Sequence, residues 1–328
     1  MQSLPYGGLC YSVFNFKNSK VVERMAPMKL SDFRYEGKGK FSLKDYPTCV
    51  KVDKDRKAEF KQKTQENTAK LAMLQDKLYA EGEQGAIIAL QAMDAAGKDS
   101  TIKHVMSGVN PQGVSVTSFK SPNNKELGHD YLWRVQQAVP ERGYIALFNR
   151  SHYEDVLCVR VHEYWKHYEW PKRCYDMSEK KFFEDRFEQI RNWEEHLYQN
   201  GYRMIKIFLN VSLDEQKKRF LERIDNPDKN WKFSSGDLKE RALWPQYMDA
   251  FEDAIQNTAT EHCPWYIIPA DKKWVMQYLV GQAAVDLLED MDPQYPEMPE
   301  EEKELLAQCR AQLVGEGENA EEPQGDQA

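Results

Sequence analysis

Long apolar stretches are missing from this sequence. No run approaches the roughly 20 residues that a helix needs to cross a bilayer, and the N-terminus lacks the basic-then-apolar pattern of a secretory leader. Cysteine is also sparse, with six residues spread along the chain: Cys10, Cys49, Cys158, Cys174, Cys263 and Cys309. No two have metal-ligand spacing, and the spread suits free thiols in a reducing compartment better than a disulfide framework. These absences favour a cytoplasmic protein.

Positive charge is in short supply as well. The chain has 45 Lys and Arg against 53 Asp and Glu, which gives a formal net charge of -8. This acidic balance argues against a general nucleic-acid binder, and neither nucleic acid nor a membrane is expected as a partner. An anionic substrate is still compatible with the charge, because a local basic groove can lie on an acidic body.

The composition divides the chain into three parts. Residues 1–50 have little periodicity and are expected to form a partly irregular N-terminal extension. Residues 51–292 are long enough for one large domain, and the 41% hydrophobic and 30% charged content fits a soluble globular protein. Residues 293–328 form an acidic tail rich in Pro, Glu, Gln and Gly, which is predicted to be largely disordered, with a helix as an option over residues 299–309.

Strand and helix patterns alternate through the middle part. Apolar runs bounded by turn residues predict buried strands near residues 85–94, 114–119, 144–149, 203–211 and 265–270. Helical spacing alternates with them at residues 54–78, 98–106, 125–139, 178–199, 212–224, 237–257 and 273–291. The alternation predicts an α/β fold with a five-stranded, mostly parallel sheet that helices cover on both faces.

The segment AMDAAGKDST, residues 92–101, follows a predicted strand and opens a helix. A turn in this place aims unpaired N–H groups and the positive end of the helix dipole at an anion. Gly97 lets the backbone approach a phosphate, and Lys98 supplies a mobile positive charge. The alternative is an ordinary strand–turn–helix in which the Gly and Lys are incidental.

The match to the pattern G-x-x-x-x-G-K-[ST] is imperfect. Ala92 replaces the first Gly, and Asp99 takes the Ser/Thr position ahead of Ser100. Asp94 lies inside the loop, where a carboxylate would repel a bare phosphate. Its place makes sense if Asp94 faces a magnesium ion, directly or through water.

A second polar segment, YIALFNRSHYEDVL at residues 144–157, lies at the C-terminal end of a predicted strand, where open α/β sheets bind ligands. The strand ends in Asn149 where a Walker B strand would end in Asp. Arg150 can contact a phosphate, and Asp155 can help to hold magnesium. The alternative is a surface ion-pair cluster made of Arg150 and the neighbouring acids.

Together these two segments resemble the second family of polyphosphate kinases, in the class that phosphorylates both AMP and ADP. The family loop reads G-x-D-x-x-G-K, and MDAAGKDSTIKHVMSGVNPQG and FNRSHYEDVL look like its two signature stretches. SFKSPNNKELGHDYLWR and NWKFSSGDLKER also look like family segments, so the resemblance covers roughly residues 30–291. Ala92 departs from the usual first Gly, and Asn149 differs from the Asp of other classes in the family.

The resemblance implies a P-loop kinase-like three-layer sandwich with a helical lid near residues 224–245. It implies transfer of the terminal phosphate of inorganic polyphosphate to AMP and ADP, reversibly, to give ADP and ATP. It also implies Mg²⁺ as the cofactor, with Mn²⁺ as a substitute, and a homo-oligomer, either a dimer or a tetramer. For residues 226–235, an ordinary interhelical turn anchored by Trp231 is the alternative to a lid.

The resemblance also assigns site residues, which the spacing of cations in the chain supports. The expected catalytic residues are Asp94, Lys98, Arg150 and Asp155, with Asp94 and Asp155 on the metal. The expected nucleotide-binding residues are Asn149, Glu154, Arg219 and Arg223. The expected phosphate- and polyphosphate-binding residues are Ala95, Ala96, Gly97, Lys98, Asp99, Ser100, Lys103 and Lys120.

Two other functions are compatible with parts of this pattern. A nucleoside monophosphate kinase with ATP as donor would share the fold, the loop and the lid, but it would have a closed purine pocket in place of a long basic groove. A non-catalytic binder of polyphosphate or nucleotide is the second alternative. The intact set of Asp94, Lys98 and Asp155 argues against it.

Overall fold

Six strands make one sheet in the order β1-β6-β5-β2-β4-β3. The computed structural model describes residues 28–168 and 170–318 of the chain. The strands are β1 Arg34–Tyr35, β2 Gly85–Gln91, β3 Val114–Ser118, β4 Ile145–Asn149, β5 Tyr202–Asn210 and β6 Trp265–Pro269. Strands β2 to β6 pair in parallel, whereas β1 runs antiparallel to β6 at the edge.

The predicted α/β architecture is confirmed, but the predicted count of five strands is wrong. The sixth strand is β1, which consists of two residues within the segment expected to be an irregular extension. A pair of residues is too short to show an alternating pattern, so no local signal identifies it. Residues 1–27 of that extension lie outside the described residues.

The longer helices are α1 Lys57–Glu81, α2 Lys98–Val105, α7 Glu179–Gln199, α8 Leu213–Asp225, α9 Gly236–Ala242, α10 Trp244–Thr258, α11 Lys273–Met291 and α12 Glu300–Glu318. Four-residue helices are α3 Asn124–Leu127, α4 Trp133–Gln136, α5 Cys158–Val161 and α6 Lys172–Tyr175. Short 3₁₀ helices are η1 Leu30–Phe33, η2 Leu43–Asp45, η3 Lys54–Arg56, η4 Pro111–Gly113, η5 His152–Asp155, η6 Tyr164–Lys166 and η7 Pro227–Lys232. No helix in the described part of the chain is both long enough and apolar enough to span a membrane.

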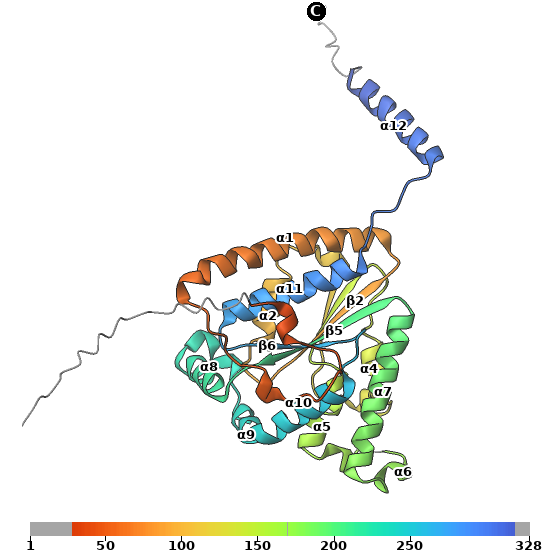
Figure 1. Ribbon diagram of the computed structural model, residues 1–328. Coiled ribbons are helices and arrows are strands. Elements are labelled where there is room, and N and C mark those ends of the chain that lie inside the picture. The colour runs from red at the N-terminus through yellow and green to blue at the C-terminus, as the bar shows by residue number, and fades with distance from the viewer. Residues whose placement is uncertain (1–27, 169, 319–328) are drawn as a thin grey trace, which may run out of the picture.

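Helices lie on both faces of the sheet (Figure 1). Successive residues of β2 point to opposite faces, so one strand contributes to two cores. Ile88 and Leu90 belong to the larger apolar cluster, to which α1 and α11 contribute, whereas Ile87 and Ala89 cluster with Leu197 of α7. Every residue of β2 is buried, as expected for a central parallel strand.

Two predicted helices are each broken in two, and the acidic tail differs from its prediction. Residues 125–139 form α3 and α4 rather than one helix, and residues 237–257 form α9 and α10. Pro245 explains the second break, because it lies in the first turn of α10, where its missing N–H is tolerated but a continuing helix is not. The tail, predicted to be largely disordered with a helix as an option over residues 299–309, forms the longer helix α12, which projects away from the body (Figure 1); residues 319–328 lie outside the described residues.

The parallel pairing places the carboxyl ends of β2, β4 and β5 at one edge of the sheet. Leu90 of β2 is paired with Asn149 of β4, and Gln91 is paired with Phe208 of β5. The segments that follow β2 and β4 are the two polar motifs of the sequence. The sheet makes them neighbours, and contacts between them join residues 50 or more positions apart in the chain, as between Asn149 and Asp99.

A buried ion pair ties the second motif to the core. Lys206 of β5 and Glu194 of α7 lie 2.6 Å apart, and both are almost fully buried. Lys206 Nζ also donates to the Thr258 carbonyl, and the hydroxyl of Tyr153, in η5, donates to Glu194 at 2.8 Å. Burial alone would raise the pKa of Glu194, but the ammonium of Lys206 and the bond from His152 lower it below its ordinary value.

We expect Lys206→Met to lower the free energy of unfolding by about 3–5 kcal/mol, because it leaves Glu194 charged and unpaired in the core. Urea unfolding followed by circular dichroism measures this. The matched control is Lys181→Met, which removes an exposed ion pair to Asp185 on α7 and should change stability by no more than about 0.5 kcal/mol. Equal stability of the two variants would contradict the structural importance of the buried pair.

Candidate functional site

The loop between β2 and α2 reverses the chain in six residues, Ala92 to Gly97. Ala95 and Gly97 both have left-handed backbone conformations, with φ of 60° and 111°. Gly97 also has little free space, since a Cβ there would lie 3.2 Å from Met276 Cε and 3.4 Å from Ser100 Oγ. The positive φ therefore favours glycine at this position, as the sequence predicts for a phosphate loop, and a Cβ would in addition require the end of Met276 to shift slightly.

The N-terminus of α2 presents free N–H groups. Thr101 is the first residue of this helix whose N–H bonds within it, to the Gly97 carbonyl at 3.0 Å. The hydroxyls of Ser100 and Thr101 donate to the same carbonyl, at 2.9 and 3.0 Å. Ser100 therefore caps the loop in this structure, and its hydroxyl oxygen stays available as an acceptor. The preceding N–H groups are oriented for an anion.

Lys98 folds back across the loop. Its Nζ donates to the Ala92 carbonyl at 2.7 Å and to the Met93 carbonyl at 3.4 Å. Burial, together with the positive charge of Arg150, lowers the pKa of Lys98 to about 8. An anion that replaced water beside this ammonium would restore its preference for the charged form.

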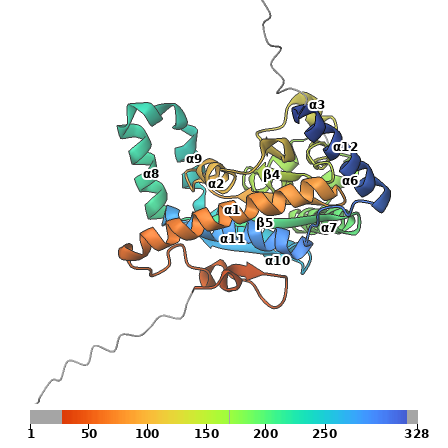
Figure 2. The ribbon, with the colours of Figure 1, turned by 90° about the horizontal axis from the view of Figure 1, so that it is seen from above.

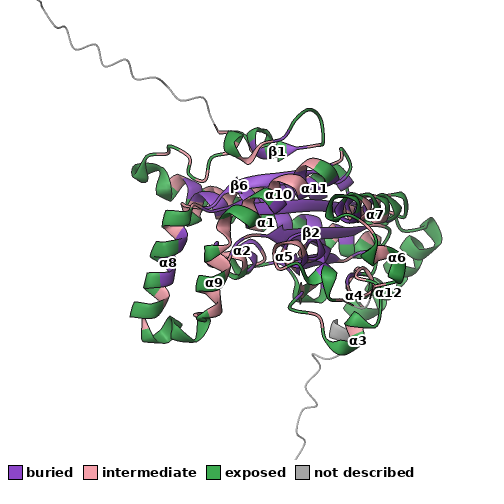
Figure 3. Cartoon of the chain, turned by 90° about the horizontal axis from the view of Figure 1, so that it is seen from below, coloured by how far each residue is buried: buried purple, intermediate pink, exposed green. Residues whose placement is uncertain are grey.

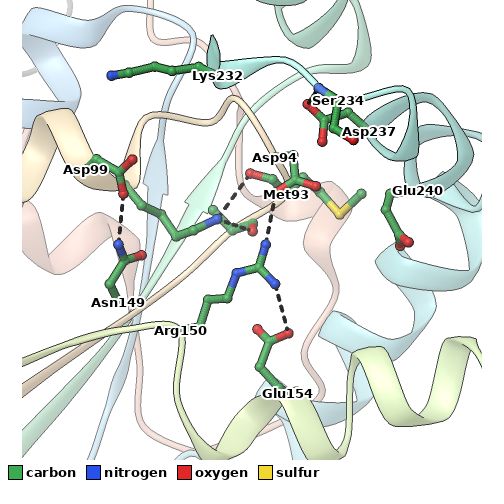
Figure 4. A network of polar contacts seen from close by, with 12 residues as sticks. Met93, Asp94, Asp99, Asn149, Arg150, Glu154, Lys232, Ser234, Asp237 and Glu240 are labelled. Carbon is green, nitrogen blue, oxygen red and sulfur yellow. Dashed lines mark hydrogen bonds and ion pairs between the residues drawn. The ribbon is translucent and has the colours of Figure 1, made fainter. Parts of the chain in front are cut away.

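Arg150 links the two motifs (Figure 4). Its guanidinium lies 3.1 Å from Asp94 Oδ1 and 3.6 Å from Glu154 Oε2, while Asn149 donates to Asp99 at 2.8 Å. Arg150 has a left-handed backbone with φ of 65°, a conformation that non-glycine residues adopt rarely and often at functional sites. Burial raises the pKa of Glu154, against the opposing charges of Arg150 and Lys98.

The structure therefore brings six predicted residues into one cluster, the loop-side cluster: Asp94, Lys98, Asp99, Asn149, Arg150 and Glu154. Asp155 does not join it through any contact among the described residues. Its carboxylate lies 2.8 Å from Arg186 Nε, and burial raises the pKa of Asp155 in spite of this ion pair. The structure thus holds Asp155 through Arg186, apart from Asp94, and its role on the metal stays a prediction.

Neither of the two predicted arginines of α8 contacts a side chain of the loop-side cluster within the described chain. Arg219 is 4% exposed and donates to the carbonyls of Ala95 and Ala96. Arg223 donates to the Lys232 carbonyl at 3.3 Å and lies 3.8 Å from Asp237. Neither geometry was predictable from sequence, because the partners are backbone groups or distant side chains.

A cavity of about 610 Å³ opens beside the loop-side cluster. Its polar end contains Arg150, Glu154 and Asp155, and Lys120 also lines it. Its aromatic side is formed by Tyr131, Tyr164, Tyr168 and Trp170. The volume falls in the range of small-molecule sites, and the mixture of rings with a few charged groups is typical of such sites. Lys103, by contrast, is exposed on α2 and does not line this cavity.

Sequence reasoning missed this aromatic wall. None of its four aromatic residues is among the site residues that the sequence predicts. The rings lie in a stretch of short helices without a regular period, so no pattern aligns them on one face. The high local density of aromatic residues was the available signal.

Helices α8 and α9 project beyond the edge of the sheet, joined by η7 (Figures 2 and 3). Trp231, in η7, is 78% exposed. At the base of this projection, Glu240 of α9 contacts the rest of the domain. Its carboxylate accepts a hydrogen bond from the Tyr247 hydroxyl at 2.6 Å and lies 3.0 Å from His162 Nε2. Figure 4 shows Asp237, at the start of α9, near Asp94 of the loop. Burial and the negative charge of Asp94 raise the pKa of Asp237.

The residues at the loop fit a magnesium ion that substrate phosphates help to hold. Among residues 28–168 and 170–318, no three His, Cys, Asp or Glu side chains form a complete metal cage. Mg²⁺ needs none, since it commonly binds through one or two carboxylates plus phosphate oxygens and water. Asp94 offers such a carboxylate inside the phosphate loop, with 27% of its side chain exposed.

Comparisons with known proteins agree with this geometry. The family model described as Polyphosphate kinase 2 matches residues 53–296. The chain is 45% identical, over 88% of its length and 99% of the relative, to an ADP-polyphosphate phosphotransferase of Rhodopseudomonas palustris. It is 44% identical, over 84% of its length and 99% of the relative, to an AMP/ADP-polyphosphate phosphotransferase of Meiothermus ruber. A crystal structure of polyphosphate kinase 2 from Arthrobacter aurescens TC1 superimposes with a TM-score of 0.74 at 38% identity, over 84% of this chain and 95% of that one.

The lowered pKa of Lys98 predicts pH-dependent anion binding. As pH rises through about 8, Lys98 loses its positive charge, so affinity for tripolyphosphate should fall. The limiting slope is about tenfold per pH unit, because one proton is taken up on binding. Any proton that tripolyphosphate loses in this range makes the ligand more negative and would strengthen its binding to a cation, so the ligand does not cause the fall.

Isothermal titration calorimetry between pH 7 and pH 10 measures this prediction. The matched control is Lys98→Arg, whose guanidinium stays charged throughout this range. We expect the control to have a flatter profile, whatever its absolute affinity. The same fall in both proteins would assign the titration to another group.

Proposed function

The chain belongs to the polyphosphate kinase 2 family, and on this premise we propose that it transfers the terminal phosphate of inorganic polyphosphate to AMP and ADP. The products are ADP and ATP, and the reaction is reversible. One observation carries the proposal: a phosphate loop, with Lys98 and Asp94, lies beside a cavity of about 610 Å³ that has an aromatic wall. The relatives from Rhodopseudomonas palustris and Meiothermus ruber, named for ADP and for AMP/ADP, support the same substrates.

The cavity is suited to the acceptor nucleotide and the loop to the phosphate that is transferred. An aromatic wall can stack on a purine base, while Arg150 and Glu154 lie between the cavity and the loop. Glu154 is then close to the acceptor and is our candidate for nucleotide choice. The predicted contacts of Asn149 and Lys120 with substrate belong to the same proposal.

The reaction needs no covalent enzyme intermediate and no general base. A terminal phosphate oxygen of AMP or ADP, already ionised, attacks the last phosphorus of the polyphosphate. The bond from that phosphorus to the next bridging oxygen breaks, and its electron pair stays on the shortened polyphosphate. Positioning and electrostatic stabilisation do the catalysis, so Lys98, Arg150 and the N–H groups of the loop suffice to neutralise the transferred group.

Asp94 would hold Mg²⁺, with Mn²⁺ as a substitute, together with phosphate oxygens of the substrates. When bound, the ion would neutralise phosphate charge and orient the groups for in-line transfer. Asp155 stays a weaker candidate for this role, since its carboxylate already pairs with Arg186.

We also propose that α8, η7 and α9 act as the predicted lid over residues 224–245. The projection carries Arg223, Lys229 and Lys232, which suit a polyanion, and its α9 end lies near Asp94. A lid that excludes water favours transfer to the nucleotide over hydrolysis. A cytoplasmic location and a dimer or tetramer complete the proposal; the five cysteines in the described chain carry free thiols, which suits a reducing compartment.

Nucleotide formation by the purified protein tests the function directly. The protein is given long-chain polyphosphate and magnesium without ATP, with AMP in one reaction and ADP in another. We expect ADP followed by ATP from AMP, and ATP from ADP. If polyphosphate gives no product but ATP plus AMP gives ADP, the protein is a nucleoside monophosphate kinase instead.

We expect Asp94→Asn to lower kcat by at least about 100-fold, because it removes a charge from the centre of the transfer site. The free energy of unfolding should change by less than about 1 kcal/mol, since the Asp94–Arg150 pair is partly exposed. Steady-state kinetics and thermal unfolding are measured on the same preparation. Asp249→Asn, on the exposed side of α10, is the control, and a fall in activity that matches a loss of folded protein would refute the assignment.

A further inference from the structure

Helix α8 holds three consecutive carbonyl groups of the phosphate loop. Gln216 Nε2 donates to the Asp94 carbonyl at 2.9 Å. One turn further along, the Nη1 of Arg219 donates to the carbonyls of Ala95, at 3.1 Å, and Ala96, at 2.6 Å. Both α8 side chains are nearly inaccessible, with exposures of 1% and 4%. These bonds connect positions more than 120 residues apart in the chain.

The remaining donors of Arg219 are also occupied. Its Nη2 donates to the Ala270 carbonyl at 2.6 Å and, at 3.4 Å, to that of Asp271. Its Nε donates to Glu215 at 2.9 Å. The guanidinium is thus fully used in connecting the loop to the end of β6. Contact with a substrate phosphate would require it to give up these bonds.

The direction of the carbonyls decides the direction of the N–H groups. In a planar trans peptide the C=O of one residue and the N–H of the next point in opposite directions. With the carbonyls of Asp94, Ala95 and Ala96 turned to α8, the N–H groups of the residues that follow each of them point away from it. The N–H of Ala96 bonds the Met93 carbonyl at 3.2 Å, whereas those of Ala95 and Gly97 have no partner within the described chain.

We propose that Gln216 and Arg219 are positioning residues for the phosphate loop, which they orient through its carbonyl groups. They keep three carbonyl oxygens from facing the phosphate and leave free N–H groups to bind it. This inference deepens the proposed function and rests on the loop as the phosphate site. It gives Arg219 a role distinct from the direct nucleotide contact that the sequence predicted.

Gln216→Met tests the proposal, since it removes the donor to Asp94 with little change in length or volume. The matched control is Gln199→Met, the same exchange on α7. Gln199 is exposed and donates to Glu195 at 2.8 Å, so its loss removes a side-chain amide bond away from the loop and the lid. Both proteins are compared with wild type in kcat, in nucleotide KM and in calorimetric affinity for tripolyphosphate.

We expect Gln216→Met to lower kcat by about 10- to 100-fold, since small displacements of a catalytic group have effects of this size. Nucleotide KM should stay within about threefold, because the cavity that we assign to the nucleotide lies outside the loop, and tripolyphosphate should bind at least about tenfold more weakly. Gln199→Met should stay within about threefold of wild type in all three quantities. Unchanged kcat per folded Gln216→Met molecule, or an equal loss in Gln199→Met, overturns the proposal.

Two substitutions of Arg219 distinguish a positioning role from a direct effect of its positive charge on phosphate. Arg219→Lys keeps the positive charge but cannot reach several carbonyls at once, so it should be no more active than Arg219→Gln. Substantial activity of the Lys variant would show a phosphate contact instead and would overturn the positioning role. If wild type itself fails to use polyphosphate, tripolyphosphate binding by the Gln216 and Gln199 variants still tests the loop, so failure of the proposed function is seen separately.

Discussion

The parallel pairing of β2 between β4 and β5 is the constraint on which the site depends. It places the carboxyl ends of three strands side by side, so the segments that follow them must meet at one edge. The hydrogen bonding between β2 and β4 continues into the site, since the N–H of Arg150 donates to the Leu90 carbonyl at 3.0 Å. Because β5 ends at Asn210 and α8 begins at Leu213, α8 has to start beside the loop that follows β2.

The loop-side cluster sets two cations, Lys98 and Arg150, against three acids, and its surroundings disfavour the charged form of one group of each sign. Burial lowers the pKa of Lys98 and raises that of Glu154, so both charged forms are disfavoured by their surroundings. The positive charge of Arg150 opposes the rise in the pKa of Glu154 and adds to the fall in the pKa of Lys98. A polyanion bound at the loop would favour the charged form of Lys98 and compete with Glu154 for Arg150. The electrostatics thus suit a phosphate ligand even though the chain as a whole is acidic.

Local patterns predicted much of this molecule. The central strands are apolar runs, and the two polar motifs follow two of them, so the sheet, the loop and six clustered residues could be read from the sequence. What could not be read depends on distant partners. Asp155 pairs with Arg186, and Arg219 bonds carbonyls 123 and 124 residues away, although each matched a family position for metal or nucleotide. The break at Pro245 did have a local signal, whereas the two-residue strand β1 had none.

Different kinds of contact fix the backbones of the two motifs. The difference follows from which chemical groups each motif directs toward the substrate. The second motif presents side chains, Arg150 and Glu154, so its backbone can be fixed through neighbouring side chains. Tyr153 and His152 do this by reaching the buried Glu194–Lys206 pair. The loop presents its own N–H groups, so it can be fixed only through its carbonyls, and neutral or cationic donors are required for that. A buried amide and a guanidinium from α8 meet this requirement, whereas a carboxylate at either position would repel the loop. Helix α8 also leads into the projecting helices. Movement of that segment would therefore first change the orientation of the peptide groups that face the phosphate.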